Sequence, residues 1–265
     1  MEPATVTTHP VPPLDAAAQA QAQQPAPAEA AASIAPSHSV AGTVVDICGE
    51  RAGFRYATDP LDAAAALSWV AEVATESRLH GGAVFGIDIE TTSLFPHDGR
   101  IRLVQIAAGD RCVVLDAFAF DPWAVIREHA ALPETLWTAH NAQFEQSWLG
   151  HHAGFTLLPM FDTRWVHVRN RALRTGVIAP SGSSLATVCE QLLDFPLSKE
   201  ERLSDWSTQP LSDAQLKYAA LDALVLIRLR EQLERDVIDG GWQHEVAVSL
   251  RHTEADARRH GRPPT

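Results

Sequence analysis

The stretch that decides the fold is residues 83–92, which read AVFGIDIETT. A nearly continuous apolar run of this length is typical of a strand that is buried on both faces. The run ends in two acids, Asp88 and Glu90, which stand two residues apart. Because alternate side chains of a strand project to one face, the two carboxylates are expected to converge. The sequence therefore predicts a central strand with an acidic pair at its carboxyl end.

An acidic pair at the edge of an apolar core has an electrostatic cost, because the two anions repel each other and lose hydration. A divalent cation is the simplest compensation, and hard oxygen ligands favour Mg²⁺ or Mn²⁺. A strand that ends in two solvated acids would show the same three-residue pattern, so the pair alone leaves both interpretations open.

A second group of polar side chains stands on a predicted helix near the carboxyl end. Residues 211–222 read LSDAQLKYAALD, in which Ser212 and Gln215 occupy the positions of a capping box. Tyr218 and Asp222 stand four residues apart and therefore share one helix face. The alanines around them would let the helix pack close to a sheet. Taken alone, the segment favours a half-buried tyrosine and an exposed aspartate over a functional pair.

A third acid lies between these two segments. Residues 137–145 read WTAHNAQFE, and the pattern predicts a strand that runs into a helix. Asn141 and Glu145 are again four residues apart. An acid placed where a strand leads into a helix is typical of an active site in an α/β protein.

The periodicity of the remaining chain predicts a mixed-sheet α/β domain. Strands are expected at Thr43–Cys48, Ala83–Ile89, Ile101–Ala107, Cys112–Leu115 and Leu136–Ala139. Helices are expected from Asp59-Pro60 to Gly81-Gly82 and at Pro122–Ala131, Ala142–His151, Asp162–Leu173, Ser184–Leu193, Ser212–Arg235 and Trp242–Arg259.

The composition is that of a globular protein, with 265 residues, 46% hydrophobic and 20% charged. The net charge of −12 argues against a protein that holds nucleic acid by bulk electrostatics. Three separated cysteines indicate neither a disulfide framework nor a zinc site. The sequence has no apolar run of membrane-spanning length and no lysine or arginine before Arg51, so we expect a cytoplasmic protein. Residues 1–41, rich in alanine, proline and glutamine, are expected to be a disordered tail.

Together these segments resemble the DEDD superfamily of 3′→5′ exonucleases, in its tyrosine subclass. The motifs stand in the order DxET from Asp88, HNxxF from His140 followed by Glu145, and YxxxD from Tyr218 to Asp222. Residues 102–107, 161–163, 184–197 and 204–207 are also similar to ribonuclease D and to the proofreading domain of DNA polymerase I. The resemblance implies a ribonuclease H-like mixed sheet flanked by helices. We expect the exonuclease domain over residues 42–240, and a C-terminal helix and tail over residues 241–265.

The resemblance also implies the roles of the site residues. Asp88 would bridge two Mg²⁺ or Mn²⁺ ions, and Glu90 and Asp222 would complete the site of the first ion. Glu145 would reach the second ion through water, and Tyr218 would orient the attacking water. The family normally has aspartate at the position of Glu145. A water-mediated ligand tolerates the extra methylene better than a direct magnesium ligand does, because octahedral geometry is strict.

The implied partner is nucleic acid with a single-stranded or frayed 3′ end, either RNA or DNA. The candidate substrate-binding residues are Thr91, His140, Asn141, Arg164, Lys199 and Trp206. The segment Thr163–Val188 contains four arginines and no acid, which indicates either a phosphate-binding strip or a solvated helix face. Trp206 is compatible with stacking on a base or with packing in the core. His140 is compatible with a structural role.

The predicted function is therefore metal-dependent 3′→5′ hydrolysis that releases mononucleotides. One alternative is a catalytically weakened relative that only binds nucleic acid, which Glu145 and the net charge of −12 favour. Another is a phosphatase or other metal hydrolase on a similar fold, although that class does not account for the HNxxF and SDWS stretches. The chain has neither the extra helical domains of ribonuclease D nor a polymerase domain, so we expect a nuclease that finds its own substrate. The sequence leaves the oligomeric state open.

Overall fold

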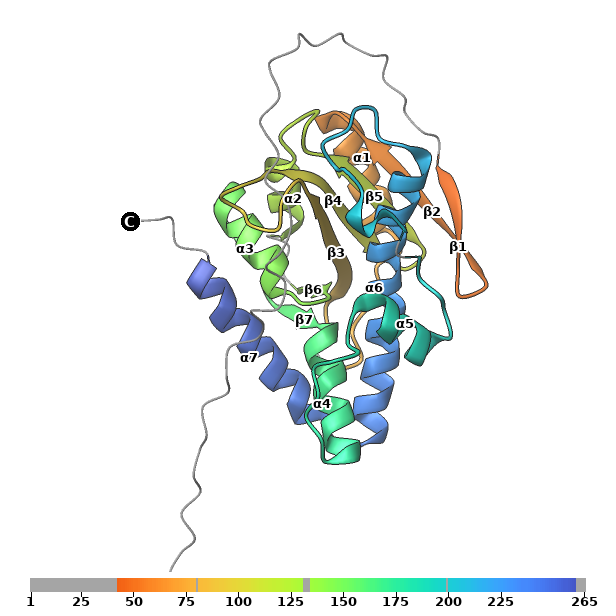
Figure 1. The fold of residues 1–265 in the computed structure, drawn as a ribbon, viewed down its shortest axis with the longest axis vertical. Helices are drawn as coiled ribbons and strands as arrows, with labels where there is room; N and C mark the ends of the chain where they lie inside the picture. Colours follow the sequence, from red (N-terminus) through yellow and green to blue (C-terminus); the bar gives the residue numbers. More distant parts are fainter. Residues whose placement is uncertain (1–41, 80, 131–133, 199, 261–265) are drawn as a thin grey trace, which may run out of the picture. The chain divides into compact units, whose positions relative to one another are not determined.

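The computed structural model describes residues 42–79, 81–130, 134–198 and 200–260 (Figure 1). The predicted tail, residues 1–41, lies outside the described residues, so its disorder stays a prediction. No helix in the described ranges is both long enough and apolar enough to cross a membrane.

A seven-stranded mixed sheet forms the centre of the fold, in the order β1-β2-β5-β4-β3-β6-β7. Its strands are β1 (Thr43–Ile47), β2 (Glu50–Ala57), β3 (Ala83–Thr91), β4 (Ile101–Ala108), β5 (Arg111–Asp116), β6 (Thr135–Ala139) and β7 (Met160–Asp162). The pairs β1–β2, β3–β4 and β4–β5 are antiparallel, whereas β2–β5, β3–β6 and β6–β7 are parallel. The predicted mixed-sheet α/β class is confirmed, with β3 in the interior of the sheet.

Helices cover both faces of this sheet (Figure 1). On one face, α1 (Pro60–Ala71), α2 (Trp123–Ala130) and α3 (Gln143–His152) enclose the first core cluster. On the other face, α5 (Leu185–Leu193) and α6 (Asp213–Asp239) enclose the second. A smaller cluster joins α4 (Thr163–Thr175) and α7 (Gln243–His260) to β7 and to the last turns of α6. The two-sided cover explains why β3 and β4 are apolar almost throughout.

Some elements differ from the prediction. Helix α1 ends at Ala71, ten residues before Gly81, and β2 and the 3₁₀ helix η1 (Glu200–Leu203) were not predicted. Strand β2 reads ERAGFRYA, and its charged residues and glycine hide the alternation of a strand. Strand β7 has only three residues and exists through its pairing with β6, which no local pattern reveals.

Helix α6 approaches β3 most closely at Gly86. A Cβ atom at Gly86 would lie 2.8 Å from the backbone oxygen of Ala223 and 3.4 Å from Leu226 Cβ. The same part of α6 carries Ala219 and Ala220, which are fully buried. Small residues on both elements therefore set the distance between the helix and the strand.

A buried arginine links the same helix to the sheet further along its length. Arg230 Nη2 lies 2.7 Å from Glu234 Oε1, and both side chains are almost inaccessible to solvent. Arg230 Nη1 also donates to Thr138 Oγ1 of β6 at 2.9 Å. The ion pair lies within α6, so it is the hydrogen bond from Arg230 to Thr138 that links the helix to β6.

The close approach at Gly86 predicts a large effect of one methyl group. We expect Gly86→Ala to lower the free energy of unfolding by about 1–3 kcal/mol, because the new Cβ overlaps the backbone of α6. Gly53 of β2 is the matched control, since a Cβ there would meet Trp69 at an ordinary 3.5 Å. Urea denaturation of both variants measures the difference. Equal stabilities of Gly86→Ala and Gly53→Ala would show that α6 can move away from β3 without a loss in the free energy of unfolding.

Candidate active site

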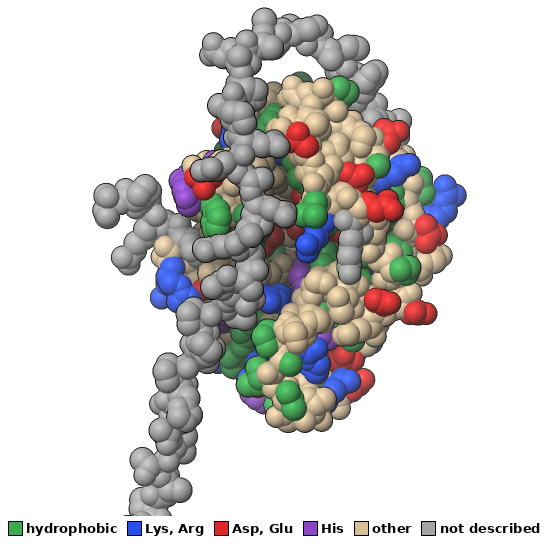
Figure 2. Space-filling model, viewed as in Figure 1, with side chains coloured by type: hydrophobic (Ala, Val, Ile, Leu, Met, Phe, Trp, Pro, Cys, Tyr) green, Lys and Arg blue, Asp and Glu red, His purple; other side chains and the backbone are tan. Residues whose placement is uncertain are grey.

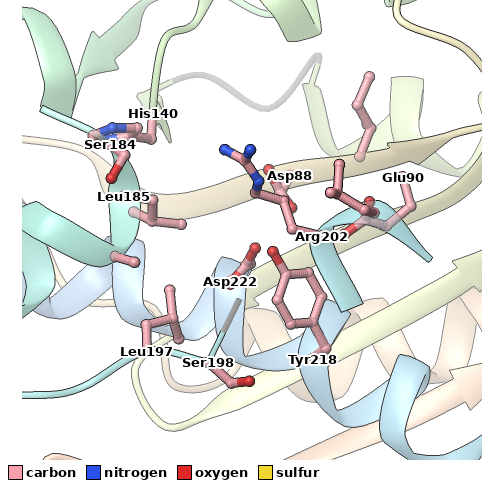
Figure 3. Close-up of a pocket in the computed structure, with 13 residues that line it drawn as sticks. Asp88, Glu90, His140, Ser184, Leu185, Leu197, Ser198, Arg202, Tyr218 and Asp222 are labelled. Atoms are coloured by element: carbon pink, nitrogen blue, oxygen red, sulfur yellow. The ribbon is translucent and has the colours of Figure 1, made fainter. Parts of the chain in front are cut away.

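Three carboxylates from two elements meet at the carboxyl end of β3 (Figure 3). Asp88 and Glu90 belong to β3, and Asp222 belongs to α6. One carboxylate oxygen from each residue lies within 4.8 Å of the other two. The structure thus brings together the strand pair and the helix acid that the sequence spacing singled out.

The electrostatics of this cluster disfavour three bare anions. Burial raises the pKa of Asp88 to about 7. Burial, and then the charge of Asp88, raises the pKa of both Glu90 and Asp222 well above the usual range. Among the described residues, Asp222 Oδ1 is buried without a hydrogen-bond partner. A set of crowded, unsatisfied carboxylate oxygens fits a hard divalent cation such as Mg²⁺.

Tyr218 stands one turn before Asp222, and its hydroxyl points toward the cluster (Figure 3). Burial, and then the charges of Asp222 and Glu90, raise the pKa of Tyr218 far above that of a free phenol. The hydroxyl therefore stays protonated and available as a hydrogen-bond donor. The ring of Trp206 packs against the tyrosine, with 6.3 Å between the ring centroids.

Glu145 lies beside the cluster and is not one of the three mutually close acids. Its side chain is buried in the first turn of α3, and Oε2 has no hydrogen-bond partner among the described residues. Burial, followed by the charge of Asp88, raises the pKa of Glu145 well above the usual range. The amino end of α3 partly offsets this cost, because a helix N-terminus favours an anion.

The candidate residues His140 and Asn141 are held by hydrogen bonds to the protein. The His140 ring nitrogens lie 2.9 Å from Thr163 Oγ1 and 2.8 Å from the backbone oxygen of Ser183. Asn141 Oδ1 accepts from Arg164 Nη1 at 2.9 Å. Asn141 adopts a left-handed conformation, with φ at 71°, and precedes α3 rather than belonging to it. These contacts favour positioning roles for both residues.

Asp162 organises this wall of the site. Its Oδ1 accepts from the backbone N–H of Asn141 at 3.0 Å and of Arg164 at 2.9 Å, and its Oδ2 accepts from Ala142 N–H at 3.1 Å. One carboxylate therefore caps α4 and also fixes the turn that leads to Glu145. The sequence indicated only that Asp162 begins a helix.

The structure describes two of the other three substrate-binding candidates, Thr91 and Trp206. Thr91 donates its hydroxyl hydrogen to the backbone oxygen of Ser93 at 2.6 Å. Trp206 is only 5% exposed and belongs to the second core cluster, which favours packing over base stacking. Lys199 lies outside the described residues.

The predicted arginine strip is partly neutralised by acids that are distant in sequence. Arg169 donates two hydrogen bonds to Glu245, and Arg174 lies 3.5 Å from Asp236. Acidic and basic side chains are interspersed on the face shown in Figure 2. A solvated helix face, the alternative interpretation of this segment, therefore accounts for part of the strip.

The acids open into a cavity of about 470 Å³. Its opposite wall comes from the segment between α4 and α6, which contributes Ser184, Leu185, Ala186, Leu197, Ser198, Arg202 and Leu203. Four of them belong to the stretch 184–197 that resembles ribonuclease D, whereas Ser198, Arg202 and Leu203 lie outside the stretches that carry the resemblance. Their signal is position, because a chain that leads directly into the helix of Tyr218 and Asp222 has to pass close to that helix.

A model of the 3′–5′ exonuclease family matches residues 62–238, which contain β3, α3 and almost all of α6. The chain belongs to the 3′–5′ exonuclease family. The acidic cluster of Asp88, Glu90 and Asp222 lies within the matched region.

Known members of the family show how far the similarity extends. DNA polymerase I of Aquifex aeolicus is 30% identical over 162 residues, which are 61% of this chain and 25% of the polymerase. Brucella melitensis NrnC, solved with bound pGG, is 27% identical over 69% of this chain and 86% of NrnC, with a TM-score of 0.59. NrnC has also been solved with bound Mg²⁺.

Escherichia coli RNase D shows the shared ribonuclease H-like fold, with a TM-score of 0.66 and 17% identity over 80% of this chain and 51% of RNase D. The chain thus spans a quarter of the polymerase and about half of RNase D.

The raised pKa values predict that the metal-free exonuclease gains stability when an acid is neutralised. A carboxyl that ionises near pH 7 when folded and near pH 4 when unfolded destabilises the fold as pH rises between these values, and the loss persists above them. We therefore expect Asp88→Asn to have a higher Tm than the parent at about pH 8 in EDTA, and a similar Tm at about pH 4.

Differential scanning fluorimetry measures this effect, with Asp239→Asn, an exposed position on α6, as the control. Added Mg²⁺ should raise the Tm of the parent and of the control more than that of Asp88→Asn. An Asp88→Asn protein that melts below the parent in EDTA at about pH 8 would contradict the proposed repulsion.

Proposed function

We propose that this chain releases mononucleotides from single-stranded or frayed 3′ ends of RNA or DNA, using two Mg²⁺ or Mn²⁺ ions. The observation that carries the proposal is the cluster of Asp88, Glu90 and Asp222, with raised pKa values, beside the protonated Tyr218. When bound, the ions would supply a water nucleophile at neutral pH and charge stabilisation for the leaving oxygen.

The residues of the chain would hold the ions and the reacting groups. Asp88, Glu90 and Asp222 would hold the first ion, and Glu145 would act on the second ion through water. The bound Mg²⁺ of NrnC supports a magnesium site in this family. The unsatisfied oxygens of Asp222 and Glu145 support it in this chain.

In the proposed reaction, water adds to phosphorus as the bond from phosphorus to the 3′ oxygen breaks. Tyr218 would orient the water by a hydrogen bond, and its position beside the acids supports the tyrosine subclass for this chain. The proton that the water loses would pass to solvent, and the leaving 3′ oxygen would take a proton from solvent. The products are a nucleoside 5′-monophosphate and a strand shortened by one nucleotide.

The shape of the cavity supports an unpaired end as the substrate. Its volume of about 470 Å³ lies within the range of small-molecule sites, roughly 300–1,000 Å³. A terminal nucleotide matches such a site better than a duplex does, because the acids lie on buried elements below the surface. Residues 42–240 as the exonuclease domain, residues 241–265 as a C-terminal extension, and a cytoplasmic location stay predictions from the sequence.

A catalytically weakened nucleic-acid-binding protein is the second candidate. The separation of Glu145 from the three-acid cluster favours it, since the second ion would then have fewer ligands. The three mutually close acids argue against it, because uncompensated anions would repel the phosphates of a bound strand.

A labelled oligonucleotide distinguishes the two candidates. We expect a 5′-labelled strand, prepared as RNA and as DNA, to shorten in single-nucleotide steps with Mg²⁺ and to stay intact with EDTA. Asp222→Asn should abolish cleavage, because a metal ligand is lost, while Asp239→Asn should cleave at the parental rate. A parent that binds both strands but shortens neither in Mg²⁺ or Mn²⁺ would establish the weakened binder.

The unusual Glu145 generates a separate prediction. If its carboxylate acts on the second ion through water, Glu145→Asp should retain or raise the cleavage rate. Glu145→Gln should lower the rate roughly 10²-fold, because the negative charge is lost. Mn²⁺, which accepts looser geometry than Mg²⁺, should narrow the gap between the variants. If single-turnover rates show Glu145→Gln as fast as the parent in both metals, Glu145 has no role in catalysis.

A further inference from the structure

We propose that Arg202 is a further catalytic residue, whose guanidinium binds the non-bridging oxygens of the scissile phosphate and stabilises the charge that builds up there. The inference rests on the hydrolytic function proposed above. It adds a cation from the chain itself to the described lining of the cavity, whose other charged side chains are Asp88, Glu90 and Asp222.

Arg202 lies across the cavity from the acids. It belongs to η1, whereas Asp88 and Glu90 belong to β3, and all three residues line the same cavity. Figure 3 shows the side chain of Arg202 among the residues that line the cavity, together with Asp88, Glu90 and Asp222. A phosphate held at the acids would therefore lie between the acidic wall and this guanidinium.

Arg202 has no ion-pair partner within the part of the chain that the structure describes. The two fully buried arginines among the described residues, by contrast, are bound to acids, Arg102 to Asp116 and Arg230 to Glu234. An arginine locked in such a pair would have to break it before it could bind a substrate. The guanidinium of Arg202 is free to bind an incoming anion without that cost.

The backbone that carries Arg202 is nevertheless fixed to the helix of the site. Gln215 of α6 donates to Ser204 Oγ at 3.0 Å and to the backbone oxygen of Asp205 at 3.2 Å. Trp206 follows directly and packs against Tyr218. The segment after η1 is thus tied to the same helix that carries Tyr218 and Asp222. This arrangement holds the base of Arg202 in place while its long side chain stays adjustable.

The charges of the cavity indicate why a cation is needed there. Arg202 is the one lysine or arginine among the 13 described residues that line the cavity. His140 does not substitute for it, because both of its ring nitrogens face protein partners. A phosphodiester that gains negative charge beside the three acids of the cavity is stabilised by a donor on its other side. The planar guanidinium can offer two parallel N–H groups to two phosphate oxygens.

Arg202 would take no part in proton transfer, since a guanidinium stays protonated throughout. Water still forms the new bond to phosphorus, and the 3′ oxygen still leaves with the electron pair of the broken bond. The contribution of Arg202 is electrostatic and greatest in the transition state. Its loss should therefore lower kcat more than it raises KM.

Three variants test this assignment. We expect Arg202→Gln to lower kcat roughly 10²-fold, with KM changed less than about threefold. Arg202→Lys keeps the charge but cannot offer two parallel N–H groups, so its kcat should fall roughly tenfold. Arg251→Gln, at an exposed arginine of α7, is the matched control and should match the parent. All variants should keep the parental Tm and its increase with Mg²⁺, because Arg202 is exposed and has no partner among the described residues.

Sulfur substitution at the scissile phosphate distinguishes a direct contact from a structural role, because only a direct contact makes the cleavage rate depend on the substituted oxygen. A non-bridging sulfur accepts hydrogen bonds poorly, so the contacted diastereomer should slow the parent more than it slows Arg202→Gln. Measuring both proteins in Mg²⁺ and in Mn²⁺ separates this effect from weakened metal binding, because the difference between the proteins should persist in both metals.

The outcomes separate the two proposals. A parent that is inactive on both RNA and DNA would overturn the proposed function, and this inference with it. The parent could be active while Arg202→Gln has the same kcat as Arg251→Gln, or differs from it only by a higher KM. In either case the proposed function stands and Arg202 is not catalytic. An equal sulfur effect in the parent and in Arg202→Gln would likewise overturn the contact.

Discussion

The close packing of α6 against β3 is the constraint on which the site depends. Gly86 of β3 leaves no room for a Cβ beneath the backbone of Ala223, and Asp222 directly precedes Ala223 in α6. Asp88 stands two residues after Gly86 on the strand. The same small residues that close the core therefore bring an acid of the helix to an acid of the strand. A larger residue at Gly86 or Ala223 would move Asp222 away from Asp88 as well as α6 away from β3.

This packing forces together groups that would otherwise separate. The raised pKa values of Asp88, Glu90 and Asp222 report an unfavourable interaction that the rest of the fold has to outweigh. Two features help to outweigh this repulsion: the apolar cover on both faces of the sheet, and the buried pair of Arg230 and Glu234. Holding the acids in place before a cation arrives means that little reorganisation remains when it binds. Preorganisation of this kind is a main source of catalytic power.

The sequence predicted the parts of the structure that local geometry determines. The spacings of Asp88 with Glu90 and of Tyr218 with Asp222 give the same face of a strand and of a helix, and both were confirmed. Strand β7 was beyond its reach, because this strand depends on a partner distant in the chain. The hydrogen bonds that hold His140 and the ion pairs that neutralise the arginines arise in the same way. The sequence thus located the acids well, and the walls around them poorly.

The distribution of charge explains how a chain of net charge −12 can serve a polyanionic substrate. At the site, what matters is the charge within a few ångströms of the phosphate, because salt screens exposed charges beyond about 10 Å. The acids of β3 and α6 form one wall and are the ligands that cations would balance. The opposite wall is mostly small or apolar and carries Arg202. In the proposed function, a strand end between two such walls would meet cations on both sides, whatever charge the distant surface carries.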